Sequence, residues 1–199
     1  MLKVLTTPTS YDETYYENGI AAGVSCYENY RWLPELTIPL CAEMCEILEI
    51  KPTDTILDFG CAKGYMVKAF RLLHRQAFGY DISQYAKDNA CIELEDEYTD
   101  YYQWVIAKDV FEHLMYTELD HVLSSLACDN IFVVVPLGRN GKYVNPDDEK
   151  DLTHVIRENR TWWVNRIMAY FRNVQSWYSF GHMKEGRNVE SYAFIRGSR

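Results

Sequence analysis

A glycine-bounded turn between an apolar run and a helical segment is the feature of this sequence best suited to holding a cofactor. The segment is ILDFGCAKG, residues 56–64. Gly60 and Gly64 allow the backbone to turn tightly and to approach a ligand without a Cβ in the way. Asp81 ends the next apolar run, 21 positions after Gly60. This spacing suits a carboxylate that accepts hydrogen bonds from ribose hydroxyls, so the residues predict a nucleoside-containing ligand.

Two classes of cofactor use such a turn, and the charges around it separate them. The dinucleotide pattern is G-x-G-x-x-G, and here Ala62 and Tyr65 stand where its second and third glycines would be. A nucleotide-dependent oxidoreductase is therefore disfavoured. Asp58, two positions before Gly60, would repel a pyrophosphate but suits the ammonium group of an amino acid. The charges favour a ligand with a nucleoside at one end and an amino acid at the other.

A histidine at the end of a polar loop is the first candidate for proton transfer. His154 precedes a helical segment at 158–172, and Asp151 is close enough in sequence to orient its ring. Imidazole accepts a proton near neutral pH, as a general base must. A ring that caps or packs against the helix, or donates to the backbone, would explain His154 equally well.

The elements that must position these residues alternate between strand and helix signals. Strands are expected at 55–59, 77–80, 104–107, 131–135, 174–180 and 190–195, and helices at 34–50, 65–74, from 83 onward, 116–127 and 158–172. Strands separated by helices predict a doubly wound α/β fold with a mostly parallel sheet. Two strands with no helix between them predict an antiparallel pair at the C-terminus. We expect one domain over 1–199, with 1–33 as a covering arm and 34–199 as the α/β core.

Three segments occur in the order and at the spacing of a known set of motifs. They are Asp58–Gly64, Asp81, and DVFEHL at residues 109–114. On these residues, the sequence over roughly 35–140 resembles the class I S-adenosylmethionine-dependent methyltransferases, which have a Rossmann-like fold. Ala62 departs from the family, in which most members have glycine there, and a single added methyl should be tolerated.

The resemblance implies S-adenosylmethionine as the cofactor and methyl transfer to an O or N atom of a small-molecule acceptor. It implies that the cofactor site is made of the glycine turn, residues after the second and fourth strands, and a tyrosine of the arm: Asp58, Gly60, Cys61, Ala62, Gly64, Asp81, Ile82, Asp109, Val110 and Tyr16. It also places Glu112 and His113 beside the methyl donor. These two residues therefore join His154 as candidate catalytic residues.

The compressed region at 90–102 is where the family pattern is weakest. A third strand should occur there, and we expect it at Cys91–Leu94, within a very acidic stretch. The family often has an acidic residue in this region that contacts adenine, and Glu93 and Glu95 are both candidates. A chain that had lost this contact would be a non-catalytic S-adenosylmethionine-binding module, which is the alternative interpretation.

Composition limits the partners. A formal net charge of -9 disfavours nucleic acid, and a small-molecule substrate is expected, with a protein acceptor left open. The longest apolar run, Ile131–Leu137, is far shorter than the roughly 20 residues that span a bilayer. The polar N-terminal stretch predicts no signal peptide, and the six cysteines form no CxxC pair, so we expect a cytoplasmic protein. Nothing in the sequence indicates an oligomeric state.

No metal dependence is expected from the polar loop. Asp147, Asp148, Asp151 and His154 lie in this loop, and we interpret them as solvated charges rather than as ligands.

Overall fold

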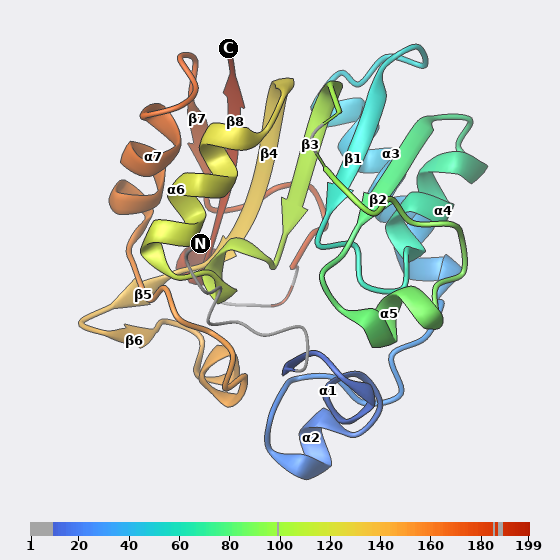
Figure 1. Ribbon diagram of the computed structural model, residues 1–199. Helices are drawn as coiled ribbons and strands as arrows, with labels where there is room; N and C mark the ends of the chain where they lie inside the picture. Colours follow the sequence, from blue (N-terminus) through green and yellow to red (C-terminus); the bar gives the residue numbers. More distant parts are fainter. Residues whose placement is uncertain (1–9, 99, 185, 187–188) are drawn as a thin grey trace.

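A mostly parallel β-sheet forms the centre of the computed structural model, which describes residues 10–98, 100–184, 186 and 189–199. Within these residues the sheet has six strands in the order β2-β1-β3-β4-β8-β7 (Figure 1). The strands are β1 (Thr55–Phe59), β2 (Gln76–Tyr80), β3 (Tyr102–Lys108), β4 (Cys128–Pro136), β7 (Gln175–Trp177) and β8 (Tyr192–Ser198). Strands β1 to β4 run parallel to one another, and β8 pairs antiparallel with both β4 and β7. The predicted doubly wound fold with an antiparallel C-terminal pair is confirmed.

Helices cover both faces of this sheet because its central strands are apolar on both sides. The helices are α3 (Pro34–Ile47), α4 (Tyr65–Leu72), α5 (Gln84–Asp88), α6 (Tyr116–Ser125) and α7 (Arg160–Met168). Alternate side chains of β4 reach opposite layers: Val133 packs in the layer of α6 and α7, and Phe132 in the layer of α3 and α4. Helix α7 is shorter than the predicted segment 158–172, since the Asn159 side chain caps it and it ends at Met168.

The predicted strand at Cys91–Leu94 is wrong. These four residues form no strand, and an isolated parallel bridge just beyond them joins Tyr80 and Glu95. Its two apolar side chains, Ile92 and Leu94, instead pack where Gly64 and Gly79 lack a side chain. Packing onto these glycines takes the place of a strand ladder, so β2 ends the sheet on this side.

Several short segments gather at the carboxyl ends of the parallel strands (Figure 1). They are α1 (Glu13–Glu17), α2 (Gly19–Ala22), the hairpin of β5 (Gly138–Arg139) and β6 (Lys142–Tyr143), and three 3-10 turns, η2 (Phe111–His113), η3 (Pro146–Lys150) and η4 (Val189–Ser191). Ligands of doubly wound sheets bind at this end of the strands. Among the described residues, no helix combines the length and apolar character that crossing a bilayer requires.

Candidate active site

The glycine turn after β1 is held against the end of β2 by hydrogen bonds. The backbone N–H groups of Gly60 and Cys61 both donate to the carbonyl of Tyr80, over 2.8 and 3.1 Å. Gly60 has φ +78°, and a Cβ at this position would lie 2.5 Å from Cγ2 of Val110. Glycine is therefore required both by the backbone conformation and by the close approach of the loop after β3.

Asp81 follows β2 and is hydrogen-bonded to this turn. Its Oδ2 accepts from the Ala62 N–H over 2.6 Å, and its Oδ1 accepts from the Ser83 N–H over 2.8 Å. Burial raises the pKa of the carboxyl group, and both backbone hydrogen bonds oppose that rise. Ala62 has φ +49°, in the left-handed backbone region that favours glycine.

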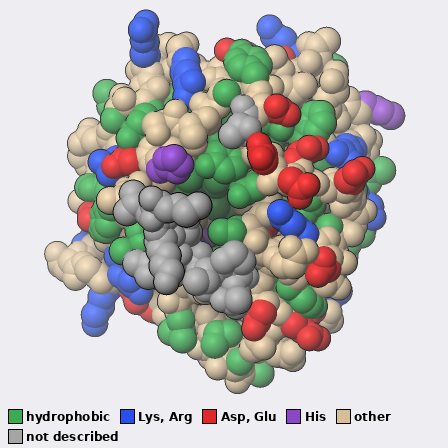
Figure 2. Space-filling model, viewed as in Figure 1, with side chains coloured by type: hydrophobic (Ala, Val, Ile, Leu, Met, Phe, Trp, Pro, Cys, Tyr) green, Lys and Arg blue, Asp and Glu red, His purple; other side chains and the backbone are tan. Residues whose placement is uncertain are grey.

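A cavity of about 530 Å³ opens in front of the turn. Figure 2 shows a hollow on this face, floored by hydrophobic side chains, with acidic side chains along one side. Seven of the ten predicted cofactor residues line the cavity: Tyr16, Gly60, Ala62, Asp81, Ile82, Asp109 and Val110. Its volume is within the range of pockets that bind cofactors and drug-sized molecules.

The other three predicted cofactor residues lie behind the turn and do not line this cavity. Asp58, Cys61 and Gly64 are all buried. Burial raises the pKa of Asp58 to about 7, against the opposing effect of Lys108. Burial also raises the pKa of the Cys61 thiol. These buried residues belong to the turn and its flanks but do not line the cavity.

Tyr98 is the residue of the 90–102 region that reaches the cavity, whereas Glu93 and Glu95 do not line it. The Tyr98 ring packs edge-on against Tyr80 and Phe59, with centroids 4.9 and 5.1 Å apart. An aromatic side chain in an acidic stretch was the available signal for this position. The family pattern of an acidic adenine contact does not predict a tyrosine there.

Tyrosines of the N-terminal segment close the cavity from the side of α1. Tyr15 and Tyr16 are each 4% exposed, and the ring of Tyr16 stacks on Tyr85 at 5.9 Å. The Tyr15 hydroxyl donates to Oδ2 of Asp151 over 2.8 Å, across 136 positions of sequence. This segment therefore connects the glycine turn with the loop after β6.

A second cavity, of about 690 Å³ and more polar, lies beyond α1. Glu112, His154 and Lys184 belong to its lining, and the two cavities adjoin at several shared residues. The residues common to both are Tyr15, Tyr27, Asp109 and His113. A group bound in one cavity would thus lie next to a group bound in the other, beside these four side chains.

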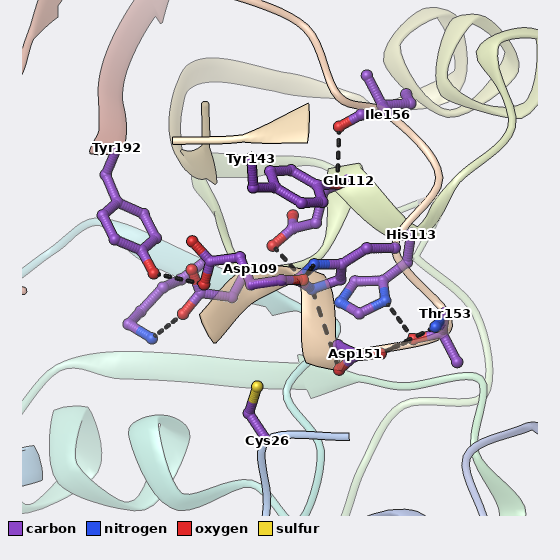
Figure 3. Close-up of polar contacts among 12 residues, drawn as sticks. Cys26, Asp109, Glu112, His113, Tyr143, Asp151, Thr153, Ile156 and Tyr192 are labelled. Carbon is purple, nitrogen blue, oxygen red and sulfur yellow. Dashed lines mark hydrogen bonds and ion pairs between the residues drawn. The ribbon is translucent and has the colours of Figure 1, made fainter. Parts of the chain in front are cut away.

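Glu112, His113 and His154 come together at the floor of the second cavity. The backbone N–H groups of Val155 and Ile156 both donate to the Glu112 carbonyl, which brings the loop onto the η2 turn. The rings of His113 and His154 meet edge to face, with centroids 4.6 Å apart. His154 Nε2 lies 4.0 Å from Glu112 Oε1. The three candidate catalytic residues therefore form one cluster (Figure 3).

Hydrogen bonds fix the orientation of both imidazoles, and Figure 3 shows the one between His113 and Thr153. His154 Nδ1 donates to the carbonyl of Asp148 over 2.8 Å. His113 Nδ1 lies 2.8 Å from the Thr153 hydroxyl, which itself donates to Asp151 Oδ1 over 2.5 Å. The hydroxyl has a single proton, so His113 Nδ1 is the donor of that pair. Each neutral ring therefore keeps its lone pair on Nε2.

Burial shifts the pKa values of Glu112 and His113. Burial and the neighbouring His154 lower the pKa of His113 to about 4, so the ring is neutral at physiological pH. Burial also raises the pKa of Glu112 well above its usual range. Asp109, with φ +56°, is different: burial opposes ionisation, but ion pairs with Lys108 and Lys184 at 2.6 and 2.7 Å hold its pKa below the usual range.

The interpretation of the polar loop as solvated charges is wrong for three of its four residues. Asp148 and Asp151 are 8% and 3% exposed, and the His154 side chain is 9% exposed. The N-terminal segment and β8 cover them, through Tyr15 on Asp151 and the Tyr192 hydroxyl on Asp148 at 2.7 Å.

Sequence reasoning missed the residues that connect these groups from distant parts of the chain. Thr153 orients His113, and Lys184 pairs with Asp109 across 75 positions of sequence. Nothing in a single sequence connects Lys184 with Asp109. His121 also lines the first cavity.

Comparison with known proteins identifies the family of this chain. The model of a family described as a methyltransferase domain matches residues 32–188. No curated protein sequence matches the chain.

Similar solved structures include an S-adenosylmethionine-dependent methyltransferase from Archaeoglobus fulgidus, with 13% identity over 82% of this chain and 94% of that chain and a TM-score of 0.62. A 1,6-didemethyltoxoflavin-N1-methyltransferase from Burkholderia thailandensis has 16% identity over 83% and 79%, with a TM-score of 0.51. An O-methyltransferase family protein from the same organism has 12% identity over 83% and 58%, with a TM-score of 0.53. At these identities the likeness shows the fold alone.

Proposed function

Because this chain belongs to the methyltransferase-domain family and uses S-adenosylmethionine, we propose that it methylates an O or N atom of a small molecule. The donor would bind in the first cavity and the acceptor in the second. The observation that carries the proposal is the common wall of the two cavities at Asp109 and His113. Transfer to an acceptor needs the two reacting groups held in contact, which two cavities that adjoin at the same residues would allow.

The residues of the first cavity fit the donor. Asp81 would accept hydrogen bonds from the ribose hydroxyls, at the place where it now accepts from the Ala62 N–H. Ile82 and Tyr98 offer apolar and aromatic surface to a flat base. Tyr16 closes the site from the arm, which we propose as the role of residues 1–33. S-adenosylmethionine supplies a methyl group bound to a positively charged sulfur atom.

The residues of the second cavity fit a polar acceptor. Its lining carries both carboxylates and amines, including Asp148 and Lys184, which suits hydrogen bonding to hydroxyl or amine groups. Its volume of about 690 Å³ suits a small molecule. The net charge of -9 argues against nucleic acid as the acceptor. The similar toxoflavin enzyme acts on a nitrogen, which supports an N acceptor as one of the two possibilities.

A proton must leave the acceptor when its reacting atom is a hydroxyl or a protonated amine. His154 and His113 both line the second cavity, and their Nε2 atoms would be able to take that proton. Asp151 lies 3.9 Å from His154 Nε2 and would stabilise the imidazolium that forms. Glu112 would contribute to the same cluster. A cytoplasmic location, supported by six free cysteines, completes the proposal.

The test is an assay with S-adenosylmethionine carrying an isotopically labelled methyl group and a panel of small hydroxyl and amine compounds. We expect labelled small-molecule products, detected by mass spectrometry. His154→Gln should lower kcat by about 10²–10⁴-fold, the usual contribution of a general base. The control is His182→Gln, because His182 is outside both cavities and bonded to Glu43. Label found only on protein, or an unchanged rate in His154→Gln, would contradict the proposal.

A further inference from the structure

We propose that Glu112, His113 and His154 bind one divalent transition-metal ion at the floor of the second cavity. One oxygen of the carboxylate and one nitrogen of each imidazole lie within 4.8 Å of one another. The inference rests on the proposed function, because it gives the acceptor cavity its chemistry. It replaces the expectation that the loop residues have no part in a metal site.

The three candidate ligand atoms lie slightly farther apart than the ligands of a bound ion do. Atoms bound at about 2.1 Å in tetrahedral geometry lie about 3.4 Å apart. His154 Nε2 and Glu112 Oε1 are now 4.0 Å apart, so this pair has to approach by about 0.6 Å. Rotation of two side chains achieves such a movement without a change in the backbone.

The hydrogen bonds of the two rings are those of metal-binding histidines. A histidine ligand donates its other ring N–H to a carbonyl, carboxylate or similar acceptor, which fixes the ring and its tautomer. His154 Nδ1 donates to the carbonyl of Asp148, and His113 Nδ1 donates to Thr153. Thr153 in turn is held by Asp151. Both rings are therefore oriented, with Nε2 left to bind.

An unpartnered oxygen is the independent observation that points to a ligand. Glu112 is 1% exposed, and its Oε2 has no hydrogen-bond partner among the described residues (Figure 3). A buried carboxyl oxygen with no partner costs roughly 1–3 kcal/mol, more if the group is charged. A bound cation would remove this cost by giving the carboxylate a partner.

Two imidazoles and one carboxylate favour a particular group of ions. Nitrogen ligands suit Zn²⁺, Co²⁺, Fe²⁺ and Ni²⁺ better than Mg²⁺ or Ca²⁺, which prefer oxygen ligands. Three protein ligands leave coordination positions open, as in catalytic rather than structural sites. These positions would face the second cavity, since all three residues line it.

The acceptor class follows from the open positions. A hydroxyl oxygen bound to the ion has a lowered pKa, and its proton passes to water. The oxygen then has the electron pair that forms the new C–O bond, while the C–S bond breaks and sulfur keeps its electrons. With the ion bound, the imidazoles act as ligands rather than as free bases. The structure thus favours an acceptor with one hydroxyl, or two adjacent ones, over an amine.

The test is a calorimetric titration of the metal-stripped full-length protein with CoCl₂ alone. We expect one equivalent to bind with micromolar or tighter affinity. Glu112→Gln and His154→Gln should each weaken binding at least 100-fold. Two controls should leave it unchanged: Cys26→Ser, whose thiol lines the same cavity, and His182→Gln, an exposed imidazole paired with Glu43. Loss of the bound equivalent in a control, or its retention in both ligand variants, would overturn the proposal.

A variant that keeps all three ligands guards against loss of folding. Thr153→Val removes the acceptor of His113 Nδ1 together with the hydroxyl's bond to Asp151, and should weaken Co²⁺ binding about 10- to 100-fold, as loss of such a partner typically does. Unchanged affinity would contradict the proposed orientation of His113. A separate titration with S-adenosylhomocysteine distinguishes the two claims. If the protein binds S-adenosylhomocysteine but not Co²⁺, only the metal site is overturned. If it binds Co²⁺ but not S-adenosylhomocysteine, only the proposed function is overturned.

Discussion

The backbone N–H of Ala62 donates a 2.6 Å hydrogen bond to Oδ2 of Asp81. This contact ties the turn after β1 to the end of β2. As a result, two motifs that are separate in the sequence belong to one site. The carboxylate is 6% exposed and already accepts from two backbone N–H groups.

Replacing Asp81 should weaken cofactor binding in steps. Asp81→Asn keeps the shape but loses the charge, and should weaken S-adenosylhomocysteine binding about 10- to 100-fold, since hydrogen bonds to a charged group contribute roughly 1.5–3 kcal/mol. Asp81→Ala should weaken it further. Calorimetry measures both, with Asp96→Asn as the control because that carboxylate is fully exposed. Unchanged affinity in Asp81→Ala would remove Asp81 from the site.

A methyl group at Gly60 should disturb the turn more than one at another glycine of similar conformation. Gly60 and Gly141 have φ +78° and +76°, but an added Cβ meets Val110 at 2.5 Å only at Gly60. Gly141→Ala should cost about 1 kcal/mol of backbone strain, and Gly60→Ala at least about 1 kcal/mol more, because overpacking adds to it. Urea unfolding measures both. Equal losses would mean that Val110 does not restrict the turn.

Tyr15 should stabilise the fold through its hydroxyl. Tyr15→Phe removes the bond to Asp151, which is 3% exposed, and should lower the free energy of unfolding by about 1–3 kcal/mol. Tyr116→Phe removes a bond of similar length, to Glu158, in an exposed setting. Its effect should stay below about 0.5 kcal/mol. If both variants unfold at the same urea concentration, the hydrogen bond between Tyr15 and Asp151 contributes nothing to the free energy of unfolding.

Asp58 should make stability depend on pH. Its pKa is about 7 in the folded chain and 3.8 ordinarily, so between these values the native state binds one more proton. The free energy of unfolding therefore falls as pH rises through this interval, by at most about 4 kcal/mol. Asp58→Asn removes the effect, so its stability relative to wild type should increase from pH 5 to pH 8. Parallel urea-unfolding profiles for the two proteins would contradict the assignment.

The order of elements could be predicted because local signals determine it. Alternating strands and helices, such as Ile131–Val135 within β4, predicted the parallel sheet and its antiparallel C-terminal pair. The error at Cys91–Leu94 has a tertiary cause. Ile92 fills the space beside Gly64, and this contact replaces strand pairing that an apolar pattern alone would suggest.

The candidate site was predictable where the motif is local and not where it depends on long-range contacts. The grouping of Gly60 with Asp81 follows from their spacing along two neighbouring strands. The burial of Asp151 depends on Tyr15, 136 positions away, and the charge of Asp109 depends on Lys184. No periodicity in the sequence reports such pairs, so the polar loop was misread as solvated.

Binding of the cofactor tests the central claim most directly. The measurement is a calorimetric titration of the full chain with S-adenosylmethionine, S-adenosylhomocysteine and NAD, repeated with Asp81→Ala. We predict micromolar binding of the first two ligands to the wild type, no binding of NAD, and loss of binding in the variant. Binding of NAD, or no binding of either sulfur-containing ligand, would contradict a methyl donor in the first cavity.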